Sequence, residues 1–210
     1  MLTRSIKTGF LLFLVMSSAK TEQMQLKGHL LVAMPGMQDP RFARSVVFIC
    51  AHSDEGSMGF VLNQPVASPS FSEILEELEM PEEGIVQAKA ESIQVFRGGP
   101  VEQGRGFVLH TLDYGTTSST RVDDLAGITA TMDALRRIAS VDSPQGYVLF
   151  LGYAGWSSGQ LEEEISHNGW LTLPATRDIL FNTPFDRQYE AALACLGISE
   201  ELLSANPGHA

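Results

Sequence analysis

The residues from Gly155 to Gly159 have the spacing of a nucleophile elbow, G-x-S-x-G, with Ser157 at its centre. An apolar run, Tyr147–Leu151, precedes them, and a helix-forming segment, Gln160–Ile165, follows. In this strand–turn–helix context a serine hydroxyl can attack an acyl carbon, provided that an acidic residue and then a histidine follow in the chain. The chemistry that this spacing suggests is that of a serine hydrolase with Ser157 as the nucleophile.

The remaining members of a hydrolase triad are difficult to place. Asp178 or Asp186 with His209 has the required order, but His209 is the penultimate residue, in a polar tail that we expect to fray. The other role for Ser157 is the N-cap of the following helix, where Gln160 would complete a capping box worth about 1 kcal/mol. We favour the cap and keep a Ser157 hydrolase as the alternative function.

Cys50 and His52 are two residues apart on a predicted strand, so strand periodicity points both side chains to one face. A thiolate–imidazole pair needs such proximity. No acidic residue that would orient the imidazole is evident, so we favour a buried cysteine near a strand-end histidine. Cys50 and Cys195 both have apolar neighbours, and no Cys/His spacing predicts a metal site.

The segment Arg97-Gly98-Gly99-Pro100 places one cation beside a flexible backbone that can offer amide groups to an anion. It lacks the lysine and hydroxyl residue of a phosphate-binding loop, and a tight turn is the commoner reason for such a sequence. No other motif predicts a bound cofactor. Nothing in the sequence places two carboxylates together as an acid/base pair.

Apolar periodicity predicts the elements that would position these side chains. Strands are expected at 28–34, 45–51, 57–63, 93–97, 106–112, 127–129 and 147–152. Helices are expected at 71–79 (opened by a Ser70–Glu73 capping box), 132–139, 160–166, 175–181, 185–196 (ending at Gly197) and 199–204. Short connections predict antiparallel hairpins for 45–51 with 57–63 and for 93–97 with 106–112. Because strands dominate the first half and helices the second, we expect an α+β fold.

Length and charge narrow the class of protein. The chain has 210 residues, which suits one domain, and a formal net charge of −11. This charge repels polyanions, and no cluster of lysine and arginine offers a nucleic-acid patch. The apolar run Phe10–Met16 is too short to span a bilayer. We therefore expect neither direct nucleic-acid binding nor a membrane span.

Taken together, several short segments resemble the AlgH/YqgE family of bacterial proteins. They are Leu26–Pro35, Asp39–Phe42, Gly56–Gly59, Asn63–Pro65, Gly98–Val101, Gly106–His110, Gly152–Trp156, Gly159–Glu162 and Asn168–Leu171. The resemblance implies a single domain with a strongly bent, mixed or antiparallel sheet like an open barrel, flanked by helices. It also implies a cytosolic protein of unestablished activity, in a family often labelled as transcriptional regulators. The family pattern near Trp156, G-W-x-x-G-Q-L, does not include a serine at Ser157.

The resemblance begins after Met24, so the residues before it need a separate interpretation. We interpret residues 1–24 as an extension outside the fold and residues 25–210 as a single AlgH/YqgE-like domain. Within the extension, Arg4 and Lys7 precede the apolar run Phe10–Met16, the pattern of a minimal signal peptide. The favoured alternative is translation from Met24 and a cytoplasmic product; export through residues 1–19 is the other possibility.

The function that we expect is that of a non-enzymatic regulatory protein that binds a protein or a small molecule. Glycine-rich strand ends would bring together a ligand site made of Asn63, Arg97, Gly98, Gly99, His110, Trp156 and Gln160. Arg97 would supply a cation, Trp156 a flat wall, and the amides hydrogen bonds, a composition that suits a small planar or anionic ligand. The competing interpretation is that the glycines only permit turns and that Trp156 only fills the core.

Overall fold

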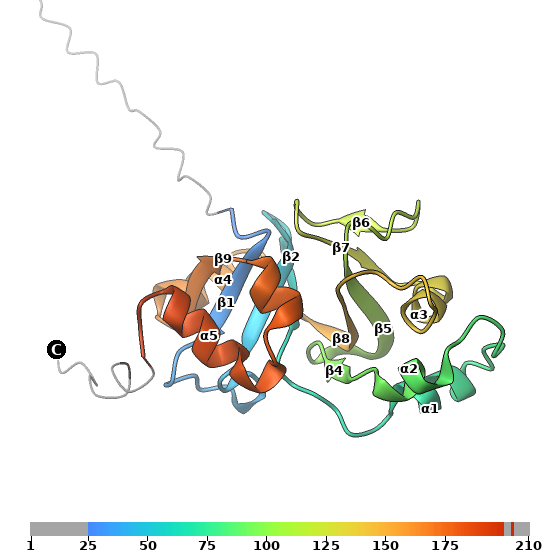
Figure 1. The fold of residues 1–210 in the computed structure, drawn as a ribbon. Helices are drawn as coiled ribbons and strands as arrows, with labels where there is room; N and C mark the ends of the chain where they lie inside the picture. Colours follow the sequence, from blue (N-terminus) through green and yellow to red (C-terminus); the bar gives the residue numbers. More distant parts are fainter. Residues whose placement is uncertain (1–24, 200–202, 204–210) are drawn as a thin grey trace, which may run out of the picture.

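Nine strands of the described residues, 25–199 and 203, form one strongly curled sheet in this computed structural model (Figure 1). In spatial order they are β6 (Thr120–Arg121), β7 (Ala126–Thr129), β5 (Val101–Thr111), β8 (Tyr147–Ser157), β3 (Gly56–Val61), β2 (Val46–Ser53), β1 (His29–Ala33) and β9 (Trp170–Pro174), with β4 (Val95–Arg97) beside β8. Neighbouring strands run antiparallel except β4, which is parallel to β8. The predicted α+β fold with a bent, barrel-like mixed sheet is confirmed.

Strand β8 belongs to both halves of the curled sheet. Its first residues, Tyr147–Leu151, pair with β5 on one edge, and part of this segment pairs with β4 on the other, whereas Ala154–Ser157 pair with β3. Between these segments Gly152 has a φ of +70°, a left-handed conformation that favours glycine and bends the strand. The two halves of the sheet therefore face each other across an open barrel, with β1, β2 and β9 opposite β5 and β7 in Figure 1.

Apolar side chains fill the space between the two halves. Phe48 and Phe60 come from one half, Phe107 comes from the other, and Phe150 comes from β8; all four are buried. The Phe60 ring centroid lies 5.2 Å from that of Phe107 and 5.1 Å from that of Phe150. Burial of apolar area and offset ring contacts both stabilise this arrangement, which joins the halves into one inner core.

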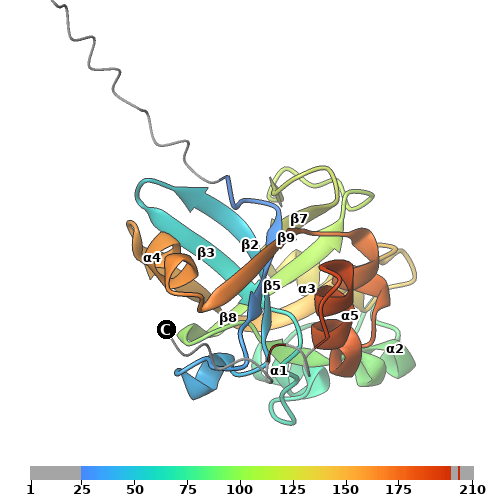
Figure 2. The same cartoon turned by 90° about the vertical axis from the view of Figure 1, so that its left-hand side faces the viewer.

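Helices cover the sheet on both its inner and outer sides. They are η1 Pro40–Phe42, α1 Phe71–Glu77, α2 Gln87–Ser92, α3 Met132–Ile138, α4 Gln160–Ser166, η2 Asp178–Asn182 (a π-helix), η3 Phe185–Arg187 and α5 Gln188–Cys195. Two short helices, η2 and α5, close the inner core, while α1, α2 and α3 pack on the outer face of β4, β5 and β8. On the outer face of β1, β2 and β3 lie η1 and α4, and Figure 2 shows α4 and α5 on different sides of this half of the sheet.

Local signals in the sequence account for several helix ends. The Ser70 hydroxyl accepts the Glu73 N–H at 3.2 Å, and the Glu73 carboxylate accepts the Ser70 N–H at 2.7 Å, so the predicted capping box opens α1. After α5, Gly197 has a φ of +70°, and the N–H groups of Gly197 and Ile198 bond to carbonyls of the last turn as in a Schellman motif. The expectation that Gly197 ends this helix is confirmed.

The two predicted hairpins have different outcomes. β2 and β3 form the antiparallel hairpin, but β4 and β5 flank β8 on opposite edges, so the hairpin between 93–97 and 106–112 is wrong. The chain crosses β8 between β4 and β5 at Gly98 and Gly99. A Cβ on Gly98 would lie 2.2 Å from the carbonyl oxygen of Gly152. Close approach of two backbones, rather than a tight turn, explains these glycines.

Four described elements are not predicted by the sequence patterns: η1, α2, β6 and β9. β9 pairs with β1, and such a contact between distant parts of the chain leaves no local signal. The helix expected at 199–204 lies almost entirely outside the described residues. None of the described helices is long and apolar enough to cross a membrane.

Candidate ligand-binding site

Two of the predicted site residues serve the fold. Asn63 joins strand ends, because its Oδ1 accepts the Val46 N–H at 3.0 Å and its Nδ2 donates to the Arg44 carbonyl at 2.9 Å. His110 is only 1% exposed, and its ring nitrogens lie 3.0 Å from a backbone carbonyl and 2.9 Å from the Thr129 hydroxyl. Burial lowers the pKa of the His110 imidazole. The expected presence of His110 in a surface site is therefore corrected: it is a core histidine.

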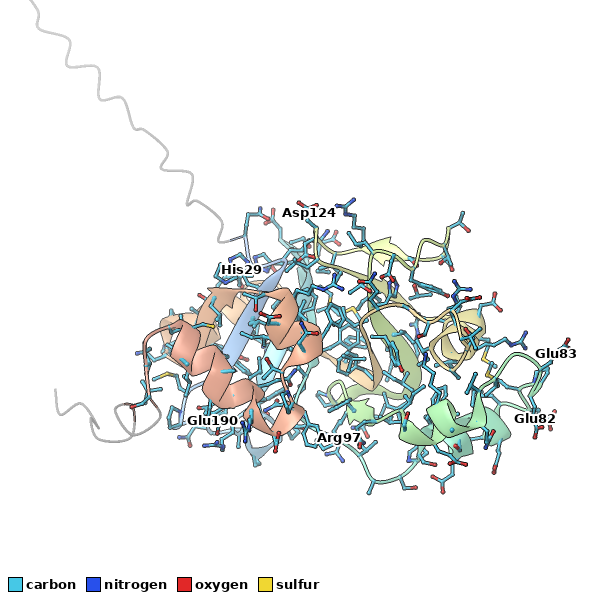
Figure 3. The ribbon with its side chains drawn as sticks, viewed as in Figure 1. His29, Glu82, Glu83, Arg97, Asp124 and Glu190 are labelled. Carbon is cyan, nitrogen blue, oxygen red and sulfur yellow. The ribbon has the colours of Figure 1, made fainter. Side chains whose placement is uncertain are left out.

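The Arg97–Gly99 segment does not offer an anion site. Arg97 is exposed at the end of β4, at the lower edge of the molecule in Figure 3. The Gly98 N–H donates to the carbonyl of Leu151, and a Cβ on Gly99 would lie 2.2 Å from the backbone nitrogen of Ala154. These glycines are packed against β8, and Arg97 does not line a hollow with Trp156. The expected anion site at these residues therefore does not form.

The other two predicted residues, Trp156 and Gln160, line a hollow of about 650 Å³ on the outer face of the sheet, which we call the outer hollow. Its walls are the segment between Gly36 and Phe42, the end of β8, one face of α4 and the start of β9. Pro100, from the chain crossing described above, reaches its edge. The outer hollow thus joins parts of the chain that are more than a hundred residues apart in the sequence.

Glu164 of α4 holds this site together. Its Oε2 accepts the indole N–H of Trp156 at 2.9 Å and that of Trp170 at 2.7 Å, and its Oε1 accepts the Gln160 amide at 2.9 Å. Gln160 and Glu164 are four residues apart, so they lie on one face of the helix. The three donors are neutral groups, and together they fix the carboxylate and both indoles in one orientation.

An aromatic cluster forms the floor of the outer hollow. The two indole centroids are 6.2 Å apart, and Phe42 lies 6.3 Å from Trp156 and 5.6 Å from Trp170. Trp156 and Trp170 are 6% and 3% exposed, whereas Phe42 is half-buried and presents more of its ring. Edge-on and offset contacts of this kind stabilise the cluster.

The outer hollow carries more negative than positive charge. The Arg41 guanidinium lies 5.9 Å from the Phe42 centroid and pairs with Asp39 at 2.6 Å. Hydrogen bonds from Arg41 hold the pKa of the Asp39 carboxyl below its usual value. Glu163 and Glu164 add two further carboxylates, so the described lining residues are acidic in sum. Across the described residues, no group of three or more histidine, cysteine, aspartate or glutamate side chains is placed to hold a metal ion.

A β-bulge in β2 separates Cys50 from His52. Ile49 and Ala51 lie opposite consecutive residues of β3, so Cys50 is an extra residue in its strand. The Cys50 side chain packs with the inner core, whereas His52 contacts Ser57 and α4 on the outer face. The prediction that the two side chains share a face is wrong, because the bulge inverts the alternation.

His52 has the acidic partner that the sequence does not reveal. Its Nδ1 is 2.8 Å from the Ser57 hydroxyl, and its Nε2 is 3.4 Å from a carboxylate oxygen of Glu162 on α4. Serine, histidine and glutamate in this order form the catalytic triad of some hydrolases. Ser57 is 9% exposed and the His52 side chain 4% exposed, and neither lines the outer hollow. We interpret the three residues as a polar contact that holds α4 on β2 and β3.

Ser157 lies within β8 and is not a helix cap. The N-cap of α4 is Gly159, and no side chain caps this helix. The Ser157 N–H and hydroxyl both donate to Gln160 Oε1 at 3.1 Å, so half of the predicted capping box forms. The prediction that Ser157 is the cap is wrong, because pairing with Gly56 extends the strand through it. The hydroxyl contacts an amide oxygen, which is not a base, and His209 lies outside the described residues.

Sequence reasoning missed Glu164, Phe42 and Trp170. The run Glu162–Glu164 looks like a solvated helix face, because adjacent acidic residues are usually exposed. One signal was available in the sequence: Glu164 is four residues after Gln160, so on a helix its carboxylate lies on the same face as that predicted site residue. Phe42 and Trp170 lie in segments that carry the family resemblance, but their meeting depends on the tertiary structure.

These features define a class of α+β proteins with a half-barrel sheet and an aromatic, acidic hollow on its outer face. Residues 30–201 match a family model described as AlgH-like, and the chain belongs to this family. It is 51% identical over 189 residues to a UPF0301 protein of Rhodopseudomonas palustris (strain HaA2), an alignment that covers 88% of this chain and 87% of the relative. The resemblance found in the sequence is therefore confirmed.

Solved structures agree with the fold. The solution structure of the AlgH protein from Pseudomonas aeruginosa is similar with a TM-score of 0.72 and 39% identity, covering 91% of this chain and 99% of that one. A crystal structure of a Corynebacterium diphtheriae protein is similar with a TM-score of 0.67 and 22% identity, covering 86% of this chain and 92% of that one. At this lower identity the second likeness shows the fold alone.

Proposed function

We propose that this protein is a non-enzymatic regulatory protein and that its outer hollow binds the positively charged group of a partner molecule. The observation that carries the proposal is the Glu164 carboxylate, which holds two indoles beside a half-buried Phe42. Aromatic faces and carboxylates are the two groups that attract an organic cation. The lining holds one guanidinium, that of Arg41, against the carboxylates of Asp39, Glu163 and Glu164, so the site keeps its acidic character.

The position of the outer hollow supports a functional role. The segments by which the chain resembles its family include Asp39–Phe42, Gly155-Trp156, Gln160 and Asn168–Trp170, and all of them contribute to this one hollow. Its volume of about 650 Å³ lies within the usual range for ligand pockets. A purely structural role for these segments would not require them to meet at a concave surface.

The chain offers a direct test, because its two tryptophans, Trp156 and Trp170, both line the outer hollow. Their indole N–H signals in a proton–nitrogen correlation spectrum therefore report on this site. We expect Nα-acetyl-arginine amide to shift both signals in a saturable way. The neutral analogue Nα-acetyl-citrulline amide, which has nearly the same shape, should shift them much less. Equal shifts from the two compounds, or none from either, would argue against a cation site.

A pair of variants controls for non-specific attraction to an acidic protein. Glu163→Gln removes one exposed charge at the outer hollow and should weaken the arginine compound about threefold, as a partly screened ion pair would. Glu83→Gln removes an exposed charge far from this site and should leave the affinity unchanged (Figure 3). If both variants lose affinity equally, the attraction belongs to the whole protein and not to the hollow.

We further propose that regulation proceeds through this binding and not through direct contact with DNA, and that the protein is cytoplasmic. The net charge of −11 supports the first statement. Free thiols at Cys50 and Cys195 are typical of a reducing compartment and support the second. No observation favours the hydrolase alternative. Labelling of wild type, but not of Ser157→Ala, by a fluorophosphonate probe would restore it.

A further inference from the structure

A second hollow lies at the mouth of the open barrel, on the inner side of the sheet. It measures about 460 Å³, and residues of β2, β3, β5, β7 and β8 line it together with the segment Ser118–Thr120. Figure 1 shows these strands facing each other across the barrel. We call it the inner cleft. It shares no residue with the outer hollow and is independent of the function proposed above.

The deeper wall of the inner cleft combines aromatic rings with sulfur atoms. Phe107 and Tyr153 meet edge-on with centroids 5.9 Å apart. Cys50, turned inward by the bulge in β2, and Met58 of β3 line the cleft beside them. Rings and polarisable sulfur make favourable contacts with a further aromatic ring. This wall therefore suits a planar aromatic group better than a sugar or a peptide backbone.

The rim of the inner cleft is polar and positively charged. Arg105 is the charged side chain among the described residues that line it. Its guanidinium lies 4.9 Å from the Phe107 centroid and pairs with Glu102 at 3.0 Å, in an exposed ion pair of the kind that contributes little. The hydroxyls of Ser118 and Thr120 line the same hollow. An anionic group at the rim would find a guanidinium that is already oriented by its stacking on a ring.

We propose that the inner cleft binds a small aromatic anion. Its ring lies against Phe107 and Tyr153, and its acidic group lies at Arg105. The volume of the cleft falls within the range of ligand pockets, and mouths of barrels are common places for them. The ligand class is opposite in charge to the one proposed for the outer hollow, because the lining charges are opposite.

The two cysteines provide a footprint of occupancy. Cys50 lines the inner cleft and Cys195 is exposed on α5, away from it. Burial raises the pKa of the Cys50 thiol, so its reaction with N-ethylmaleimide is expected to be slow and easily followed by mass spectrometry. We expect 1-naphthaleneacetate to slow alkylation of Cys50 in a saturable way and to leave Cys195 unchanged. The neutral 1-naphthaleneacetamide should protect about fivefold more weakly, as the loss of one exposed charged contact implies.

A matched pair of arginine variants tests the role of the rim. Arg105→Gln should abolish the preference for the carboxylate over the amide. Arg121→Gln should keep it, because Arg121 forms a similar exposed ion pair with a residue three positions away but does not line the inner cleft. Thermal unfolding of each variant confirms that it is folded.

Two results would overturn the proposal. The first is unchanged alkylation of Cys50 at saturating probe; a carboxylate that binds through Arg105 in this case would lie in the apolar groove between α1 and α3, which Arg105 also lines. The second is equal protection by the carboxylate and the amide.

Discussion

At the scale of single residues, Glu164 shows how one side chain organises a site. Its two oxygens accept hydrogen bonds from Trp156, Trp170 and Gln160, which lie on three different elements. A buried donor that loses its acceptor costs more free energy than a hydrogen bond contributes when it forms. The orientation of both indoles in the outer hollow therefore depends on this one carboxylate.

Replacing Glu164 should reveal this dependence. We expect Glu164→Ala to lower the free energy of unfolding by about 2–4 kcal/mol, because two indole N–H groups lose their acceptor. Glu164→Gln keeps one carbonyl acceptor and should cost less. Urea unfolding followed by circular dichroism measures both. Glu163→Ala, at the exposed neighbouring position, is the control and should change the free energy of unfolding by less than about 0.5 kcal/mol. A Glu164→Ala variant as stable as this control would contradict our interpretation.

His110 predicts a pH dependence. Burial lowers its pKa in the folded protein below the value of about 6.5 expected for an unfolded chain. The unfolded state therefore binds more protons between these two values, and stability falls as the pH decreases. The stabilisation that neutral, buried His110 gives to the folded protein is complete above the pKa of the unfolded chain. It is lost as the pH falls through the lower pKa that the histidine has in the folded protein. The stability advantage of wild type over His110→Gln should shrink between pH 7 and pH 5; an advantage that grows on acidification would refute the assignment.

At the scale of elements, strand β8 and the segment that crosses it determine how the sheet closes. β8 changes partners at Gly152, and the chain passes over this bend between β4 and β5. The bulge at Cys50 in β2 is a second irregularity, and it places His52 beneath α4 and a thiol in the inner cleft. The bulge therefore helps to shape the inner cleft, and Pro100, next to the crossing, reaches the edge of the outer hollow.

A glycine substitution tests the crossing. In Gly98→Ala the new Cβ would lie 2.2 Å from the carbonyl oxygen of Gly152, and backbone atoms cannot move aside as a flexible side chain can. We expect a loss of about 3 kcal/mol or more, or failure to fold. Gly104→Ala in β5 is the matched control, because no atom lies within 4 Å of its added Cβ. Thermal unfolding of the pair measures the difference, and equal midpoints would show that the backbone relaxes.

At the scale of the whole molecule, the sheet separates two sites of opposite charge. Tyr153 lines the inner cleft, and Gly155 and Trp156, only a few residues further along β8, line the outer hollow. Acidic side chains lie at three well-separated places on the surface: Glu82 beside Glu83, Asp124, and Glu190 (Figure 3). The net charge is therefore spread over the molecule, while the inner cleft keeps a local positive group.

The position of β8 also predicts the pattern of local stability. Strands that have neighbours on both edges open only when much of the sheet opens, whereas an edge strand can fray alone. Amide hydrogen exchange followed by NMR should therefore be slowest in β3 and β8 and fastest in β6, an exposed edge strand of two residues. Exchange in β6 as slow as in β8 would show that this edge is covered in solution.

Much of the local structure could be predicted from the sequence alone. The capping box at Ser70 and the Schellman motif at Gly197 depend on residues within a few positions of each other, so their chemistry is visible in the sequence. The hairpin of β2 and β3 follows from a short polar connection. The α+β class and the family follow from the order of such segments and from the residues that carry the resemblance.

Only the tertiary structure decided which residues come together at the two proposed sites. Hydrogen bonds from Trp156 and Trp170 to one carboxylate, and the crossing of β8 at Gly98, join residues that are distant in the chain. A local pattern can give the period of a strand, but it cannot reveal the bulge that turns Cys50 inward or the pairing that draws Ser157 into β8. The sequence by itself indicated most of the elements and the family to which the chain belongs. Register, close backbone approach and burial, which are set only when the halves of the sheet meet, decided where its side chains can act.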